Sequence, residues 1–282
     1  MVLESLIDTF KAEKKPWNLF FIGLLYSSIA LFLGNWIFKE YSSLIMVFLT
    51  TMACIPLIFF TMRVEEKKDI AIEGEGKLLK EHSKAILFMM FLFLGIMSGF
   101  VFWYVVLPSD FVQNSFQSQT LTIQSINVRI TGDILNIKTL TNIILNNLKV
   151  LIFCILFSFL YAAGAIFILT WNASVIATAI GNFIRSNMAY YATKTGFTKY
   201  AAYLQIVSLS IIRYMTHGTF EILAYFMAGL AGGIISMAVI NERFGTKRFE
   251  RVILDSSDLI LLSVLLLIVA ALIEVYITPL LF

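Results

Sequence analysis

The chain has few residues of the kinds that build redox or metal centres. Its 282 residues include two cysteines, Cys54 and Cys154, and each lies in an apolar run where a thiol packs as a small hydrophobe. We predict neither a disulfide framework nor a zinc site. Only two histidines are present, His82 and His217. The H-E-x-x-H pattern of zinc hydrolases needs two histidines one helical turn apart, so an intramembrane metal hydrolase is only a third alternative.

Charge is also scarce. Charged residues make up 14% of the chain and hydrophobic residues 59%, with a mean hydropathy of +0.87. This leaves too little polar surface for a soluble domain and indicates a multi-pass membrane protein. The net charge of +3 is small and the basic residues lie between apolar runs, which argues against a nucleic-acid partner. No phosphate loop, dinucleotide fingerprint or nucleophile elbow occurs, so no cofactor is predicted.

Six apolar runs have roughly the 20-residue length that crosses a bilayer. Two shorter stretches, Ala173–Ile184 and Ala201–Met215, lie between the fourth and the fifth run, and each is a half-helix, a re-entrant segment or a short span. The sequence therefore predicts an all-α polytopic transmembrane helical bundle, with six full spans plus one or two short or re-entrant helices and about seven crossings. The six runs are Trp17–Phe38, Ser42–Met62, Ala85–Leu107, Leu148–Trp171, Gly218–Ile240 and Leu259–Leu280.

Lysine and arginine orient these spans, because cytoplasmic loops are enriched in them. Basic residues gather at the amino end, in Arg63–Lys84 and in Arg243–Arg251. The long loop Pro108–Asn147, in contrast, has only two basic residues, Arg129 and Lys138. We therefore predict a cytoplasmic amino end and an external Pro108–Asn147 loop. The fourth run then leads inward, which predicts that Asn172–Tyr200 is cytoplasmic.

Two loops have alternative interpretations. In the external loop, VRITGDILNI alternates apolar and polar residues around a Thr-Gly-Asp turn, which is typical of a small β-hairpin. An irregular polar loop is the other interpretation. The cytoplasmic stretch from Arg63 to Lys84 has basic and acidic residues in balance and indicates a solvated linker, with His82 on its surface.

The stretch RYMTHGTFEIL places ionisable residues inside an apolar run. His217 and Glu221 are four residues apart and share one face of a helix. An ionisable residue at membrane depth costs roughly 2.5 to 3.5 kcal/mol and is kept mainly where it is paired or functional. Gly218 suggests a helix break, which would put the pair at a helix start. With Asn146 and Asn147 these residues form a candidate polar binding site; the alternative is an ordinary turn that reaches headgroup water.

Small residues predict close helix packing. Gly229 and Gly233 form a G-x-x-x-G pair, and Gly232 is a third glycine beside them. Such small residues permit close approach by another helix. Asn172 directly follows the fourth apolar run, whereas the asparagine pair precedes it. If the run is one straight helix, a rise of 1.5 Å per residue separates Asn172 from Asn147 by roughly 37 Å. Asn172 is therefore assigned, with Gly181, to a separate cytoplasmic turn.

The order of these features resembles the stage II sporulation protein M (SpoIIM) family of membrane proteins. A paired Asn precedes a span with a small residue, an Asn-Gly step follows, and a His-Gly-x-x-Glu element opens a Gly-rich helix; Ala173 stands where the family commonly has Gly. The likeness covers roughly Leu87 to the carboxyl end. We thus expect an N-terminal two-span unit with a cytoplasmic linker, 1–84, of the kind associated with archaeal members, and a SpoIIM-like membrane domain, 85–282, with the external loop 108–147. The matching residues are Asn146, Asn147, Gly164, Asn172, Gly181, His217, Gly218, Glu221, Gly229 and Gly232.

The resemblance implies a non-enzymatic scaffold or assembly factor of the plasma membrane, since the best-known bacterial member is a scaffold for cell-wall hydrolases during engulfment. Its implied partners are the lipid bilayer, other membrane or cell-envelope proteins, and further copies of the chain. No catalytic or metal-binding residue is assigned. The alternative function is a transporter or lipid-handling protein with His217 and Glu221 lining a polar cavity.

Overall fold

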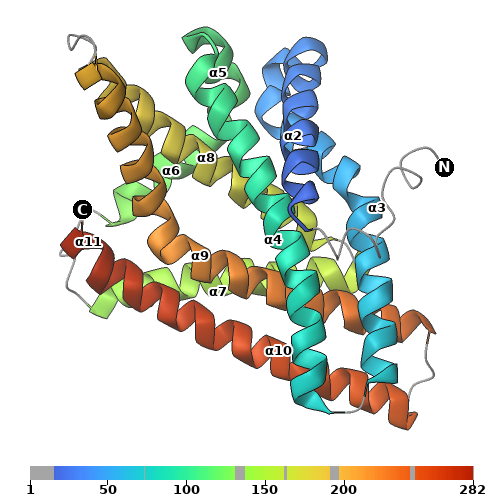
Figure 1. The fold of residues 1–282 in the computed structure, drawn as a ribbon. Helices are drawn as coiled ribbons and strands as arrows, with labels where there is room; N and C mark the ends of the chain where they lie inside the picture. The colour runs from blue at the N-terminus through green and yellow to red at the C-terminus, as the bar shows by residue number, and fades with distance from the viewer. Residues whose placement is uncertain are drawn as a thin grey trace.

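The protein is a bundle of long helices, shown in Figure 1 as a computed structural model. The structure describes residues 16–72, 74–130, 137–161, 164–190, 197–241 and 245–281, and these residues contain no β-strand. Seven of the described helices are long and apolar enough to cross a membrane. The predicted all-α multi-pass bundle with about seven crossings is confirmed. The main helices are α2 (Asn18–Ile37), α3 (Ser42–Ala71), α4 (Glu75–Val106), α5 (Ser109–Ser115), α6 (Gln117–Ile130), α7 (Ile137–Tyr161), α8 (Ala165–Tyr190), α9 (Phe197–Asn241) and α10 (Lys247–Leu272), followed by the π-helical turn η2 (Ile273–Ile277) and α11 (Thr278–Leu281).

The first three spans run side by side, α2 and α4 upright in Figure 1 with α3 beside them. Helices α2 and α4 cross at very short distance, because a Cβ atom on Gly95 would lie 2.0 Å from the carbonyl oxygen of Phe20. Only a glycine fits this crossing, so the backbones are in direct contact. The outer face of α2 exposes Phe21, Leu25 and Ile29, as expected of a lipid-facing surface.

The segment after α4 is helical rather than an irregular loop. Helices α5 and α6 follow Pro108, and the residues 128–130 that begin the suggested β-hairpin are the last turn of α6. The hairpin interpretation is therefore wrong for that part, and residues 131–136 lie outside the described residues. Ser115 on α5 accepts a hydrogen bond from Asn35 on α2 at 2.9 Å. Because Asn35 lies near the end of α2, this end of α2 meets the segment after α4.

The apolar run Leu148–Trp171 is not one span, which corrects the sequence-based boundaries. It contains most of α7, the turn residue Gly164, and the start of α8. A Cβ on Gly164 would lie 2.2 Å from the carbonyl oxygen of Phe157, so the chain folds back tightly on α7. The turn is as apolar as its flanks, so hydropathy did not reveal it. Asn172 consequently lies inside α8, and Ala173–Ile184 belongs to a full-length spanning helix.

Helix α9 passes without interruption through the predicted break at Gly218. Its 45 residues correspond to about 68 Å at the helical rise. The hydroxyls of Thr216 and Thr219 donate to carbonyls one turn back, at 2.6 and 2.7 Å. Such back-bonding often bends helices, and α9 changes direction along its length in Figure 1. His217 and Glu221 are thus mid-helix, and the expected free N–H groups of a helix start are not present there.

Contacts between helix ends fix the order of crossings. Arg251, near the start of α10, donates to the carbonyl of Ile72 between α3 and α4 at 2.6 Å, so both basic turns share one end of the bundle. Arg185 on α8 donates to the carbonyls of Tyr104 and Leu107 at 3.1 and 3.3 Å. The far end of α8 therefore lies beside the end of α4. The predicted cytoplasmic loop Asn172–Tyr200 is wrong for residues 172–188, which belong to a helix long and apolar enough to cross a membrane, and residues 191–196 lie outside the described residues.

The revised topology predicts which positions face the cell exterior. Ser186→Cys, at the end of α8, and Gln117→Cys, on α6, should both react with a membrane-impermeant maleimide on intact cells. Lys77→Cys should react only after permeabilisation. Cys54 and Cys154 are fully buried and give little background. Labelling of Lys77→Cys but not Ser186→Cys on intact cells would restore the sequence-based arrangement of this segment.

A matched pair of glycines on α9 tests the close helix packing. A Cβ at Gly232 would lie 2.9 Å from the carbonyl oxygen of Ile155 on α7, whereas a Cβ at Gly218 has no heavy atom within 4 Å. Gly232→Ala should therefore lower the free energy of unfolding by about 1 to 3 kcal/mol. Gly218→Ala should leave it unchanged or raise it by up to about 1 kcal/mol through helix propensity. Thermal unfolding of the detergent-solubilised protein measures both, and equal effects would contradict the packing.

Candidate functional site: a polar cavity between four helices

A pair of carboxyl groups lies between α7, α9 and η2. Asn147 on α7 donates its side-chain amide to Glu221 on α9 at 2.5 Å. The side chain of Glu274 on η2 lies beside Glu221 and lines the same cavity. Carboxylates only accept hydrogen bonds, so a bond between two carboxyl groups requires that one of them carry a proton.

The carboxyl pair opens into a cavity of about 510 Å³. Asn147 is 7% exposed and Tyr225 is 3% exposed, while both glutamates are partly exposed toward the cavity. A volume of this size is typical of small-molecule sites, which are usually about 300 to 1,000 Å³. The lining residues are Thr139, Asn142, Ile143, Leu145, Asn146, Asn147, Lys149, Val150, Asn172, Glu221, Tyr225 and Glu274.

The hairpin of α7 and α8 brings together residues that were expected to lie far apart. Asn172 lines the same cavity as Asn146 and Asn147, although it was assigned to a separate cytoplasmic turn. That assignment assumed a single straight span. Because the chain reverses at Gly164, Asn172 lies on a helix that returns beside α7 and faces the same cavity as the asparagine pair.

His217 and Gly218 lie one helical turn from Glu221 and are not among the cavity-lining residues. The Nδ1 atom of His217 is 3.3 Å from the hydroxyl of Thr278 on α11. The structure thus places Glu221, Asn146 and Asn147 at one cavity and His217 beside it, against the carboxyl-terminal helix. Among the described residues, the histidine has no direct hydrogen bond to Glu221.

The residues assigned to helix packing lie along the same helices. A Cβ at Gly229 would lie 2.9 Å from the Cβ of Ala165 on α8, and one at Gly181 would lie 2.5 Å from the ring of Tyr104. Gly232 faces α7, and Gly233 is buried in the same part of α9. Gly229 and Gly232 hold α9 against α8 and α7, which sets the position of Glu221, whereas Gly181 brings α8 close to α4.

Sequence reasoning missed Glu274 and Tyr225. Glu274 is the only Asp, Glu, Lys or Arg in the last apolar run, Leu259–Leu280. That isolation is the signal that identifies it, by the same argument that identified Glu221. It also lies in η2, and π-helical turns within α-helices are frequent at functional sites. Tyr225 has no comparable signal, because a lone tyrosine in an apolar helix is ordinary.

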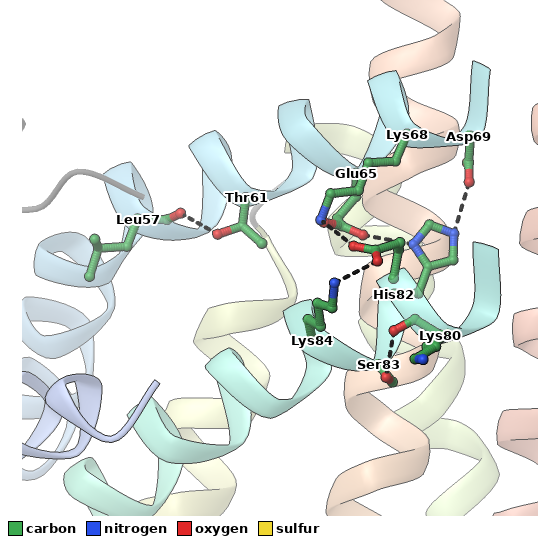
Figure 2. Close-up of polar contacts among 10 residues, drawn as sticks. Leu57, Thr61, Glu65, Lys68, Asp69, Lys80, His82, Ser83 and Lys84 are labelled. Carbon is green, nitrogen blue, oxygen red and sulfur yellow. Dashed lines mark hydrogen bonds and ion pairs between the residues drawn. The ribbon is translucent and has the colours of Figure 1, made fainter. Parts of the chain in front are cut away.

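A second polar cluster joins α3 to α4 at the basic end of the bundle. His82 is 2% exposed, not a surface residue as predicted, and Figure 2 shows it between Glu65 and Asp69. Its Nδ1 lies 2.8 Å from Glu65 Oε2 and its Nε2 lies 2.8 Å from Asp69 Oδ1. With a carboxylate acceptor at each nitrogen, both nitrogens donate and the ring is an imidazolium. Lys68 adds a bond to Glu65 at 2.6 Å.

The described residues contain no group of three or more His, Cys, Asp or Glu side chains arranged to hold a metal ion. The His82 cluster is an internal ion-pair network that fastens the two helices. The cluster lies near the hydrogen bond from Arg251 to the carbonyl of Ile72. It therefore holds α3 and α4 together close to the point where the start of α10 contacts them.

The seven apolar helices and the polar groups enclosed between them define a multi-pass α-helical membrane protein. Residues 85–279 match the family described as Stage II sporulation protein M (SpoIIM). This range is more than half of the chain, and the protein belongs to the SpoIIM family, as its sequence features predicted. The matched range contains the whole cavity, whereas α2, α3 and His82 precede it. No curated protein and no solved structure matches the chain.

The His82 cluster predicts a strong asymmetry between partial and complete replacement. His82→Ala leaves two buried carboxylates without their shared cation and should lower the free energy of unfolding by about 3 to 5 kcal/mol. Replacing all three residues, as Glu65→Met, Asp69→Leu and His82→Leu together, removes the charges and should recover most of that loss. Thermal unfolding in detergent measures both. A His82→Ala variant as stable as the parent would show that the network contributes nothing.

Proposed function

We propose that the protein binds a small polar molecule or a lipid headgroup in the Glu221–Glu274 cavity and acts as a transporter or lipid-handling protein of the plasma membrane. The observation that carries this proposal is the carboxyl pair on the wall of a cavity of about 510 Å³, where Asn147 donates to Glu221. We propose that Glu221 and Glu274 share one proton and so have a net charge of −1 together. The location of the pair supports a binding role, because polar residues at membrane depth commonly mark substrate or ion pathways.

Energetics also favour ligand binding over a purely structural role. Two carboxyl groups between helices are costly to bury, and well-packed apolar residues often stabilise a structure as well as a buried polar network does. Here the amide and both carboxyls are in place before a ligand arrives, which lowers the cost of binding.

A scaffold or assembly factor is the second candidate, and the external helices favour it. Ser43 and Ser118 are 2.7 Å apart, and Gln119 on α6 donates to Ser174 on α8 at 3.1 Å. Together with the bond from Asn35 to Ser115, these contacts fix α5 and α6 against α2, α3 and α8, so that the two helices form a platform at this end of the bundle. Such a platform suits contacts with cell-envelope proteins or with further copies of the chain. Membership of the SpoIIM family supports the same role.

Native mass spectrometry of the protein extracted from its own membranes tests the ligand-binding proposal. Glutamine is neutral like a protonated carboxyl, so a single Glu221→Gln retains the net charge of −1. The double variant Glu221→Gln/Glu274→Gln removes that charge and keeps the hydrogen-bonding shape. We expect the parent and the single variant to retain a small-molecule or lipid adduct, and the double variant to lose it roughly tenfold or more.

The control is Glu250→Gln, an exposed glutamate on α10 that does not line the cavity. It should retain the adduct. Equal adducts in all four proteins, with undiminished capture of envelope proteins by the double variant, would favour the scaffold and contradict ligand binding.

A further inference from the structure

The cavity walls have charges of both signs, and this identifies a ligand class. We propose that the cavity binds a zwitterion with an ammonium group and a phosphate group a few bonds apart, as in phosphoethanolamine. This inference rests on the proposed function, because it names the substrate class of the same site. The carboxyl pair of Glu221 and Glu274 would take the ammonium group, and Lys149 would take the phosphate group.

The negative wall suits an ammonium group with several N–H donors. Glu221 and Glu274 offer carboxylate oxygens from two helices, and the amide of Asn147 is already committed to Glu221 Oε1 at 2.5 Å. That bond holds one oxygen in place and leaves the remaining oxygens to accept. An ammonium group has three donors and no acceptor, so it complements a surface of this kind.

A tyrosine hydroxyl provides an independent sign that a ligand is accommodated here. The side chain of Tyr225 is only 3% exposed, and it lines the cavity. Within the part of the chain that the structure describes, no hydrogen-bond partner is assigned to its hydroxyl. The hydroxyl oxygen itself is accessible, so a ligand oxygen in the cavity would accept a hydrogen bond from it.

The positive wall comes from α7. Lys149 lines the cavity and is exposed, and its flexible stem lets the ammonium head move toward a ligand. Among the described residues it has no ion pair. Lysine commonly binds phosphate as a point charge, and the exposed amides of Asn142 and Asn146 lie on the same cavity wall.

Volume distinguishes a zwitterion from a bare ion. A single monovalent ion would fill only a small part of about 510 Å³. A headgroup with its first few carbon atoms fits this space better, and Ile143, Leu145 and Val150 provide apolar lining for those carbons. The same chemistry occurs in a free zwitterion and in the headgroup of an aminophospholipid, so both sources belong in the test.

The experiment measures binding to the detergent-purified chain by native mass spectrometry. Four probes are used: phosphatidylethanolamine, phosphatidylglycerol with the same acyl chains, soluble phosphoethanolamine and soluble ethanolamine. We expect phosphatidylethanolamine to bind about tenfold or more tightly than phosphatidylglycerol. If phosphoethanolamine displaces the lipid, the ligand source is a free zwitterion; if only the lipid binds, the source is the bilayer.

The variants separate the two walls. Glu221→Gln should bind within about threefold of the parent, whereas Glu221→Gln/Glu274→Gln should lose binding by about tenfold or more. Lys149→Gln should weaken the phosphate-containing probes and leave ethanolamine unaffected. Lys138→Gln, an exposed lysine of the same helix outside the cavity, is the control and should bind like the parent.

Equal binding of phosphatidylglycerol and phosphatidylethanolamine, or zwitterion binding that the double variant leaves intact, would overturn this inference. The proposed function is judged separately, by the adduct retained from native membranes. If that adduct is lost in the double variant while no zwitterion binds, the ligand class is wrong and the cavity is still a binding site. If the double variant loses nothing, both proposals fail.

Discussion

Hydrocarbon offers no hydrogen bonds, so each polar group at membrane depth needs a partner within the protein. In this protein the bond from Asn147 to Glu221 meets that constraint, and Glu274 lies beside these residues in the same cavity. They come from α7, α9 and η2. The close approach of α9 to its neighbours at Gly229 and Gly232 makes the bond geometrically accessible. The small residues and the polar residues of α9 therefore act together: the glycines bring the helices near, and the bond from Asn147 to Glu221 fixes their register.

At the basic end of the bundle, the His82 network also pairs polar groups from different helices, here through opposite charges. The imidazolium between Glu65 and Asp69 fastens α3 to α4 outside the range that matches the SpoIIM family. The tight crossing at Gly95 fastens α2 to α4. The two amino-terminal spans are thus attached to the family region by direct contacts. The cavity lies within the family region, between α7, α8, α9 and η2.

Apolar periodicity and run length were sufficient to predict a helical multi-pass bundle, and the isolated Glu221 and paired asparagines pointed to residues that the structure brings together. The turn at Gly164 could not be predicted from hydropathy, because its residues are as apolar as the helices that it joins. That single omission misplaced Asn172 and predicted a cytoplasmic loop for residues 172–188. His82 was misread because its partners lie 13 and 17 residues away on another helix. Only tertiary structure shows that such a histidine is buried.

Infrared difference spectroscopy tests the proposed shared proton, on which the account of the cavity depends, most directly. A protonated carboxyl group has a carbonyl stretch separate from that of a carboxylate, and the parent protein should show this band at neutral pH. Either Glu221→Gln or Glu274→Gln alone should remove the contribution of the pair, because the remaining carboxylate accepts from the glutamine amide instead. Loss of the band in one variant but not in the other, or in neither, would contradict a proton shared between the two glutamates.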